Sequence, residues 1–346
     1  ASILSGSRAV RDRARTPERD RYLTESDPLS STHSPARTPR PRPGEHVVSR
    51  YRWLLIPVIV IPVTIVLIVP MLLTALVKRL VPIPAITEGC RRVVTWIAGR
   101  WMDVLVGLFR RCLDTRLELT GELPDDRNRS YVVVCNHQSW SDVPILLHLL
   151  HGRVPFFRFF LKHGLIWLPL VGQAFWALEY PFVRFPSREV LERHPERRGE
   201  NLRAARRACE HLGDRATTLV NFPEGALFTR ERHAEQRPGF RHLLRPRAGG
   251  TALALATLSD RLDSLIDVSL HFPEGPPGLG RFITNRVGRV QVDVRRIRVP
   301  REMTRGDYEN DPEFRRRFQQ WLNEIWREKD RRLETLRETS EHRSTA

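Results

Sequence analysis

Apolar runs that end in turn-forming or polar residues recur along the middle of the chain and predict buried β-strands. They occupy residues 131–135, 217–221, 265–272 and 288–299. Helical patterns fall between these runs, at residues 143–150, 189–212 and 251–258. Because strands alternate with helices, we expect an α/β fold with a mixed, largely parallel sheet flanked by helices.

The longest apolar segment covers residues 53–77 and contains no charged side chain. A helix of this length would reach about 37 Å, more than the ~30 Å of a bilayer core, so we expect a membrane anchor. Pro57, Pro62 and Pro70 each remove a backbone donor and favour kinks. Basic residues flank the segment on both sides, which favours a kinked or hairpin anchor with both ends cytoplasmic; a single span is the alternative.

These patterns divide the chain into successive parts. Residues 1–50 are rich in Arg, Ser, Thr and Pro and are predicted to be a disordered basic tail. Residues 51–112 form the predicted membrane-anchoring helical segment, with an amphipathic helix at 93–109, and residues 113–310 form the α/β domain. In residues 311–346, apolar side chains at three- and four-residue steps predict an amphipathic helix that packs on the domain or, as the alternative, faces lipid.

The most informative polar residues follow the first predicted strand, where His137 and Asp142 have the spacing His-x4-Asp. A carboxylate that holds an imidazole fixes its tautomer and stabilises its protonated form, so the ring can accept a proton from a hydroxyl. The nucleophile would then belong to the substrate and not to the protein. Taken alone, the same spacing is also typical of a loop histidine capped by an aspartate, and the residues downstream decide between the two readings.

Three further stretches accompany this pair. They read WALEYPFVR at residues 176–184, NFPEGALFT at 221–229 and RPRAGG at 245–250. Together with NHQSWSD at 136–142, they resemble the motifs of the glycerolipid acyltransferase family of the PlsC type, most closely those of the bacterial YihG-type branch. Enzymes of this family acylate lysophosphatidic acid with acyl-CoA or acyl carrier protein, and the resemblance covers residues 50–330.

The resemblance implies a membrane-bound O-acyltransferase in which His137 is the general base and Asp142 orients it. It implies that Arg184 binds the acceptor phosphate. Glu224 and Gly225 match the third motif, where the glutamate orders the site or accepts a hydrogen bond from the acceptor. The resemblance also implies the inner membrane of a bacterial cell, with the catalytic domain on the cytoplasmic side.

The head group of the acceptor is less clearly indicated. Lys162 is the second candidate for its phosphate, because this chain uses arginine nearly everywhere and a retained lysine near the predicted site is unusual. The third motif of the family usually reads Glu-Gly-Thr-Arg, but here Ala226 and Leu227 occupy its last two positions, and leucine cannot contact a phosphate as arginine does. Either Arg230 or Arg232 replaces that arginine, or the acceptor is another lysophospholipid. The alternative function is a catalytically silent relative that binds acidic lipid or acyl carriers.

Composition adds expectations about partners. The formal net charge of +17 attracts anionic lipid, nucleic acid and the phosphates of CoA. No nucleic-acid-binding motif is recognised, so we expect membrane lipid and acyl-CoA or acyl carrier protein as partners, and no nucleic acid. The cysteines form neither a CxxC pair nor a zinc spacing, which predicts free thiols, no metal site and no cofactor besides the acyl-donor substrate. The sequence does not indicate an oligomeric state.

Overall fold

The computed structural model describes residues 54–345, except for 169–170, 181, 184–192, 194–214, 238, 279, 282–283 and 285–286. All described residues belong to one unit of the chain, Pro43–Ala346. The predicted tail at 1–50 lies outside the described residues, as do Arg184 and, apart from Arg193, the helix predicted at 189–212.

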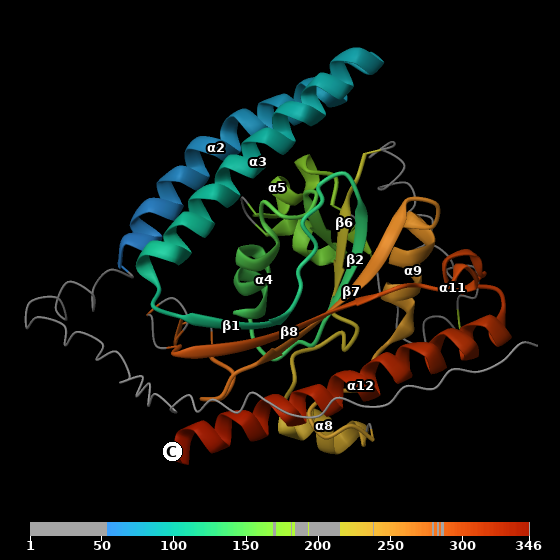
Figure 1. The fold of residues 1–346 in the computed structure, drawn as a ribbon. Coiled ribbons are helices and arrows are strands. Elements are labelled where there is room, and N and C mark those ends of the chain that lie inside the picture. Colours follow the sequence, from blue (N-terminus) through green and yellow to red (C-terminus); the bar gives the residue numbers. More distant parts are fainter. Residues whose placement is uncertain are drawn as a thin grey trace, which may run out of the picture. The chain divides into compact units, whose positions relative to one another are not determined.

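A six-stranded β-sheet forms the centre of the domain, with the strand order β1-β8-β7-β2-β6-β3 (Figure 1). Its strands are β1 (Arg116–Gly121), β2 (Ser130–Cys135), β3 (Phe157–Phe159), β6 (Thr218–Asn221), β7 (Leu262–His271) and β8 (Arg289–Ile297). β7 and β8 are antiparallel, and the other neighbouring pairs of this sheet are parallel. A separate parallel pair consists of β4 (Leu161–Lys162) and β5 (Phe182–Val183). The expected mixed, largely parallel sheet is thereby confirmed.

β2 lies between β7 and β6, and all of its residues are buried. Successive side chains of a strand point to opposite faces of the sheet. Val133 and Cys135 accordingly belong to one hydrophobic cluster, and Val132 and Val134 belong to another. A strand that is covered on both faces reads as a continuous apolar run, which is why the sequence predicted it.

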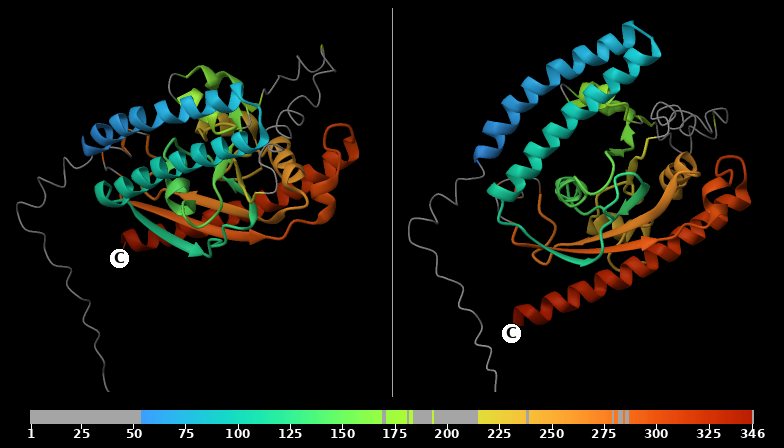
Figure 2. Two further views of the ribbon diagram at one scale, coloured as in Figure 1. Left: turned by 90° about the horizontal axis from the view of Figure 1, so that it is seen from above. Right: turned by 45° about the horizontal axis from the view of Figure 1, so that its top comes forward.

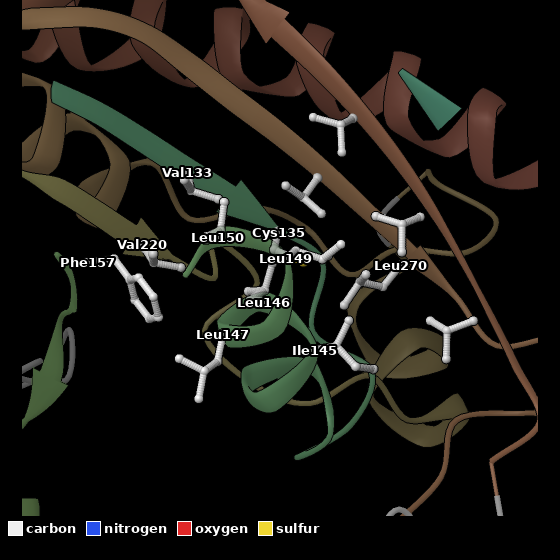
Figure 3. Packing of buried hydrophobic residues seen from close by; sticks show 14 of the residues in the cluster. Val133, Cys135, Ile145, Leu146, Leu147, Leu149, Leu150, Phe157, Val220 and Leu270 are labelled. Atoms are coloured by element: carbon white, nitrogen blue, oxygen red, sulfur yellow. The ribbon is translucent and has the colours of Figure 1, made fainter. Parts of the chain in front are cut away.

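The first face of the sheet is covered by α3 (Pro84–Cys112) and α4 (Asp142–Leu150). Figure 3 shows side chains of α4, among them Leu146 and Leu150, beside Cys135 of β2 and Val220 of β6. From α3, the side chains that join this cluster are Met102, Val106 and Phe109. The helix predicted at 143–150 is therefore confirmed, and it lies directly beneath the central strand.

The second face is covered by α9 (Ala248–Leu258) and α12 (Pro312–Thr345). Figure 1 shows α12 on the side of the sheet opposite to α2 and α3. The buried side chains that α12 contributes are Phe314, Phe318, Leu322, Ile325, Trp326 and Leu333. The predicted C-terminal amphipathic helix is confirmed, and its apolar face packs on the domain. The shorter helices are η2 (His163–Trp167), α5 (Val171–Ala177), α8 (Arg230–Gln236) and α11 (Arg301–Arg305).

α2 (Leu55–Leu80) and α3 lie side by side as a helical hairpin (Figure 2). Pro62 and Pro70 lie inside α2 and do not end it, so α2 is one continuous helix through both prolines. The indole Nε1 of Trp101 on α3 donates to Oγ1 of Thr64 on α2 at 2.9 Å. Among the described helices, α2 alone is long and apolar enough to cross a membrane, and most of its side chains are not buried.

Glu179 connects this hairpin to the segment that follows α5. Its carboxylate lies 3.0 Å from Nζ of Lys78 on α2 and 3.3 Å from Nε of Arg91 on α3. The backbone of Glu179 has φ +58, a left-handed conformation that is uncommon for a residue with a side chain. This ion-paired residue therefore fixes where the WALEYPFVR stretch meets the two helices.

Candidate active site

Parallel strands end together at one edge of the sheet, where β2 ends at Cys135, β6 at Asn221 and β7 at His271. Loops that leave the carboxyl ends of neighbouring parallel strands come close together. Here they touch, because the backbone N–H of Phe228 donates to the carbonyl oxygen of His137 at 2.7 Å. The NHQSWSD and NFPEGALFT stretches, which are far apart in sequence, thus meet at this edge.

The side chains of His137 and Asp142 lie next to each other in the loop after β2. Nδ1 of His137 is 2.9 Å from Oδ2 of Asp142. The same oxygen accepts hydrogen bonds from the backbone N–H groups of Gln138 at 2.7 Å and Ser139 at 2.9 Å. Because an ionised carboxylate only accepts hydrogen bonds, Nδ1 carries the proton and Nε2 keeps its lone pair. The free nitrogen is therefore the one that can accept a proton from another molecule.

Neighbouring strands hold this loop in place. Asn136 is buried, and its side chain donates to the carbonyl oxygen of Leu270 at 2.9 Å and accepts from the Leu270 N–H at 2.8 Å. The ring of Phe222, which follows β6, stacks on the His137 imidazole with the ring centroids 4.1 Å apart. One face of the imidazole is thereby covered, while the His137 side chain keeps 17% of its surface exposed.

Asp142 is fully buried and is the first residue of α4. Burial raises the pKa of Asp142, and the hydrogen bonds from His137 and from the Ser139 and Gln138 amides oppose that rise. Within the described residues, its second oxygen Oδ1 has no hydrogen-bond partner. A carboxylate that is shielded from water interacts strongly with its neighbours, so Asp142 stabilises a positive charge on the His137 ring.

Glu224 is a second buried carboxyl group at this edge, with 1% of its surface exposed. Burial raises the pKa of Glu224 well above its ordinary value; the positive charge of Lys329 opposes the rise and the negative charge of Asp142 adds to it. The amide groups of His137 and Leu244 lie near this carboxyl group, but within the described residues neither of its oxygens makes a hydrogen bond of normal geometry. Glu224 thus lies beside the His137 loop, with its protonated form favoured.

The turn after β6 directs Glu224 inward. Gly225 has φ +68, a conformation that favours glycine, and its N–H donates to the carbonyl oxygen of Phe222 at 3.0 Å. Residues 222–225 of the NFPEGALFT stretch therefore form a tight turn whose glutamate is buried and whose glycine is exposed.

The other two predicted substrate-binding residues belong to the β4–β5 pair. Lys162 lies in β4 and is paired with Val183 of β5. Arg184 follows Val183 in the chain and lies outside the described residues. The structure therefore brings Glu224 and Gly225 to the His137 loop, and it places the backbone of Lys162 beside the residue that precedes Arg184.

Lys329 of α12 is a charged residue of the interior that the sequence reasoning missed. It is fully buried, and its Nζ is 2.6 Å from Oδ1 of Asp267 on β7. The guanidinium of Arg295 pairs with the same aspartate. A signal was present in the sequence, because Lys329 falls on the apolar face of α12, at three- and four-residue steps from Trp326 and Leu333. The stacking of Phe222 on His137 had no such signal, since it depends on two loops that meet only in the folded chain.

Possible metal ligands and cysteine thiols are two further classes of reactive group. No group of three or more His, Cys, Asp or Glu side chains there could hold a metal ion. Cys90, Cys112 and Cys135 are buried free thiols. Burial also raises the pKa of Cys135 well above its ordinary value, which keeps this thiol in its unreactive protonated form.

Comparison with known proteins finds similarity over the part of the chain that contains this site. A family model described as Acyltransferase matches residues 116–257, the stretch that runs from β1 into α9 and contains His137, Asp142, Glu224 and Gly225. A 1-acyl-sn-glycerol-3-phosphate acyltransferase epsilon of Mus musculus is 24% identical over 255 residues, which are 67% of this chain and 65% of that protein. Lysocardiolipin acyltransferase 1 of Danio rerio is 25% identical over 271 residues, which are 72% of this chain and 64% of that protein.

The chain thus spans slightly less than two thirds of the length of these two relatives. Among solved structures, the 1-acyl-sn-glycerophosphate (LPA) acyltransferase PlsC from Thermotoga maritima is 17% identical, with a TM-score of 0.41 that covers 81% of this chain and 96% of that one. The family match contains the His-x4-Asp loop and the Glu-Gly turn that meet at the edge of the sheet. Residues 116–257, which carry these site residues, are therefore the part of the chain that is similar to the acyltransferase family.

Proposed function

We propose that this protein is a membrane-bound O-acyltransferase that moves a fatty acyl group from a thioester to the hydroxyl of a lysophospholipid. The observation that carries the proposal is the His137–Asp142 pair, with Nδ1 held at 2.9 Å from a buried carboxylate. This arrangement leaves Nε2 as a proton acceptor at the carboxyl edge of the sheet. The acyltransferase match over residues 116–257 supports the same reaction class.

In the proposed reaction, His137 Nε2 takes the proton of the acceptor hydroxyl as the hydroxyl oxygen attacks the thioester carbonyl carbon. A new carbon–oxygen bond forms, and the carbon–sulfur bond breaks when the tetrahedral intermediate collapses. The thiolate that leaves takes up the proton from His137, so the protein returns to its starting state. Asp142 keeps the imidazole in the required tautomer and stabilises its charged form. The protein supplies no nucleophile in this reaction, and no covalent acyl-enzyme is needed.

The proposed acceptor is lysophosphatidic acid or another lysophospholipid, and the proposed donor is acyl-CoA or acyl carrier protein. The names of the mouse and zebrafish relatives, which specify 1-acyl-sn-glycerol-3-phosphate and lysocardiolipin, support a lysophospholipid acceptor. Arg184 and Lys162 are proposed to bind its phosphate, with Glu224 and Gly225 shaping the turn beside the reacting hydroxyl. The net charge of +17 is favourable for both phosphate-bearing substrates.

We further propose that α2 anchors the protein to the cytoplasmic side of a bacterial cell membrane, as in the YihG-type branch. The exposed apolar side chains along α2 support the anchor. The NHQSWSD and WALEYPFVR stretches support the branch, and the basic residues on both sides of residues 53–77 support the orientation.

The deciding experiment is an acyl-transfer assay on detergent-purified protein. Radiolabelled oleoyl-CoA or oleoyl-acyl carrier protein is offered to lysophosphatidic acid, glycerol 3-phosphate and several lysophospholipids. We expect His137→Ala to lower kcat by a factor of about 10³ or more while the protein stays folded. The matched control is His151→Ala. His151 follows the last residue of α4 and contacts Asp103 of α3, so we expect this variant to retain activity. Full activity of His137→Ala would contradict the proposal.

A second candidate function is a catalytically silent protein that binds acidic lipid or acyl carriers. Leu227, in the place where the related motif has an arginine, favours it. This function requires lipid binding without turnover on any acceptor of the panel. Any acyl transfer that depends on His137 excludes it.

A further inference from the structure

The RPRAGG stretch has no role in the reaction described so far, although it lies at the edge of the sheet that carries His137. It spans the end of the loop before α9 and the first residues of that helix. Arg247 is the N-cap residue of α9. The backbone N–H of Arg247 donates to the carbonyl oxygen of Pro223 at 2.8 Å. Pro223 directly precedes Glu224, so this hydrogen bond ties the start of α9 to the Glu-Gly turn.

The start of α9 is also fixed against the end of β6. A Cβ atom added at Gly250 would lie 2.9 Å from Oδ1 of Asn221, so the glycine allows a close approach that a side chain would prevent. Nδ2 of Asn221 donates to Oγ1 of Thr251 at 3.0 Å. The backbone that carries Arg247 is therefore held in place relative to β6.

The side chain of Arg247 lies over Gly225. A Cβ atom added at this glycine would be 3.4 Å from Cδ of Arg247, 3.7 Å from Nε and 3.8 Å from Nη1. The arginine is exposed, and within the described residues no carboxylate forms an ion pair with it. Its guanidinium is thus free to bind an anion next to the turn whose glutamate lies beside His137.

Two other cations near this edge are engaged. Nη1 of Arg232 donates to the carbonyl oxygen of Leu227 at 2.9 Å. Lys329 is fully buried and paired with Asp267. Neither of these two side chains is as well placed as Arg247 to meet an anionic ligand that approaches from solvent.

We propose that Arg247 is a further residue that binds the phosphate of the acceptor lipid, and that it thereby sets the preference of this site for a phosphate-bearing lysolipid. This inference rests on the proposed function, because that function identifies the acceptor as a lysophospholipid. Chemically, a planar guanidinium presents paired N–H donors that match phosphate oxygens. Gly225 contributes to this arrangement, because the absence of a side chain there leaves the space in which Arg247 lies.

The test measures acceptor binding without an acyl donor, so that it does not depend on turnover. Lysophosphatidic acid and a monoacylglycerol of the same chain length are presented in mixed micelles at fixed surface concentration to the full chain. The variants are Arg247→Ala, Arg247→Lys and the control Arg245→Ala. Arg245 is exposed two residues away, and its backbone N–H, which the substitution retains, donates to Oε1 of Gln236.

We expect Arg247→Ala to weaken binding of lysophosphatidic acid about ten- to a hundred-fold and to leave monoacylglycerol binding unchanged. Arg247→Lys keeps the charge and loses part of the affinity, and Arg245→Ala behaves as the unaltered protein. The inference is overturned if Arg247→Ala matches Arg245→Ala, or if it weakens both ligands equally.

The same samples separate this inference from the proposed reaction. If the unaltered protein transfers no acyl group but its binding of lysophosphatidic acid depends on Arg247, the proposed reaction fails and the inference stands. If His137-dependent transfer is observed while Arg247→Ala leaves KM for lysophosphatidic acid unchanged, the reaction stands and the inference fails. Equal thermal midpoints for the Arg247 and Arg245 variants exclude misfolding as the cause of a difference.

Discussion

Asp142 is the residue that holds the His137 imidazole in the proposed reaction. One of its oxygens accepts from the imidazole and from the backbone amides of Gln138 and Ser139, and the side chain is fully buried. All of these partners lie within the same short loop. The geometry of the pair is therefore set locally, by backbone that the strand β2 and the helix α4 hold at either end.

The substitution Asp142→Asn keeps the size of this side chain and removes its charge. We expect kcat to fall about 10²- to 10⁴-fold, with a smaller change in KM, because a neutral amide neither fixes the tautomer nor stabilises the imidazolium. Steady-state kinetics with oleoyl-CoA and a saturating lysophospholipid measure the effect. A kcat within three-fold of the unaltered protein would show that His137 does not work through this carboxylate.

At the scale of residues, the sequence predicted the contacts between residues that are close along the chain. His137 and Asp142 are close because they are five positions apart and flank the start of a helix. Gly225 was predicted from its motif, and its positive φ explains why a glycine is suited to the turn. The contacts of Phe222 with His137 and of Arg247 with Gly225 join loops that are distant in sequence, and no local pattern indicates them.

At the scale of elements, the quality of the prediction followed burial. β2, β6, β7 and β8 are largely buried and read as apolar runs, so the sequence predicted each of them. β1 is an edge strand with mostly exposed residues, and no apolar run marks it. β3, β4 and β5 are only two or three residues long, too short for any periodicity to develop.

α12 is joined to the sheet by a buried charge as well as by apolar side chains. Lys329→Met removes that charge and leaves Asp267 with Arg295 as its remaining ion-pair partner. We expect the free energy of unfolding to fall by about 3 kcal/mol, because breaking one side of a buried pair leaves a charge that is poorly compensated. Urea titration followed by tryptophan fluorescence measures this loss.

The matched control is Arg331→Met on the same helix. Its ion pair with Glu328 is exposed, so its removal changes the free energy of unfolding by less than about 0.5 kcal/mol. If the two variants were equally stable, the charge of Lys329 would not contribute to the attachment of α12.

For the molecule as a whole, His271 links stability to pH. Burial lowers the pKa of His271 to about 4, and the positive charges of His242 and Arg337 contribute, while Glu341 opposes them. Between pH 6.5 and 4 the unfolded chain binds a proton at this histidine that the folded chain does not bind. The contribution of His271 to stability is therefore complete above pH 6.5 and is lost as the pH falls towards 4.

His271→Gln removes this titration. We expect the thermal midpoint of the variant to fall less steeply than that of the unaltered protein between pH 6.5 and pH 4. The reason is that the unaltered protein takes up to about one additional proton when it unfolds in this range. Differential scanning calorimetry across this range measures the slopes. Parallel curves for the two proteins would mean that His271 binds its proton equally well in the folded and unfolded states.

The order of synthesis sets the order in which this fold closes. α2 leaves the ribosome before any strand of the sheet, whereas α12 leaves it after all of them. Val132, Val134 and Leu265 belong to the cluster that α9 begins and α12 completes, so part of this face of the sheet stays open to water until Trp326 has been made. The nascent chain consequently exposes two apolar surfaces in succession, first the helix α2 and then part of one face of the sheet, and both favour aggregation until the chain is complete.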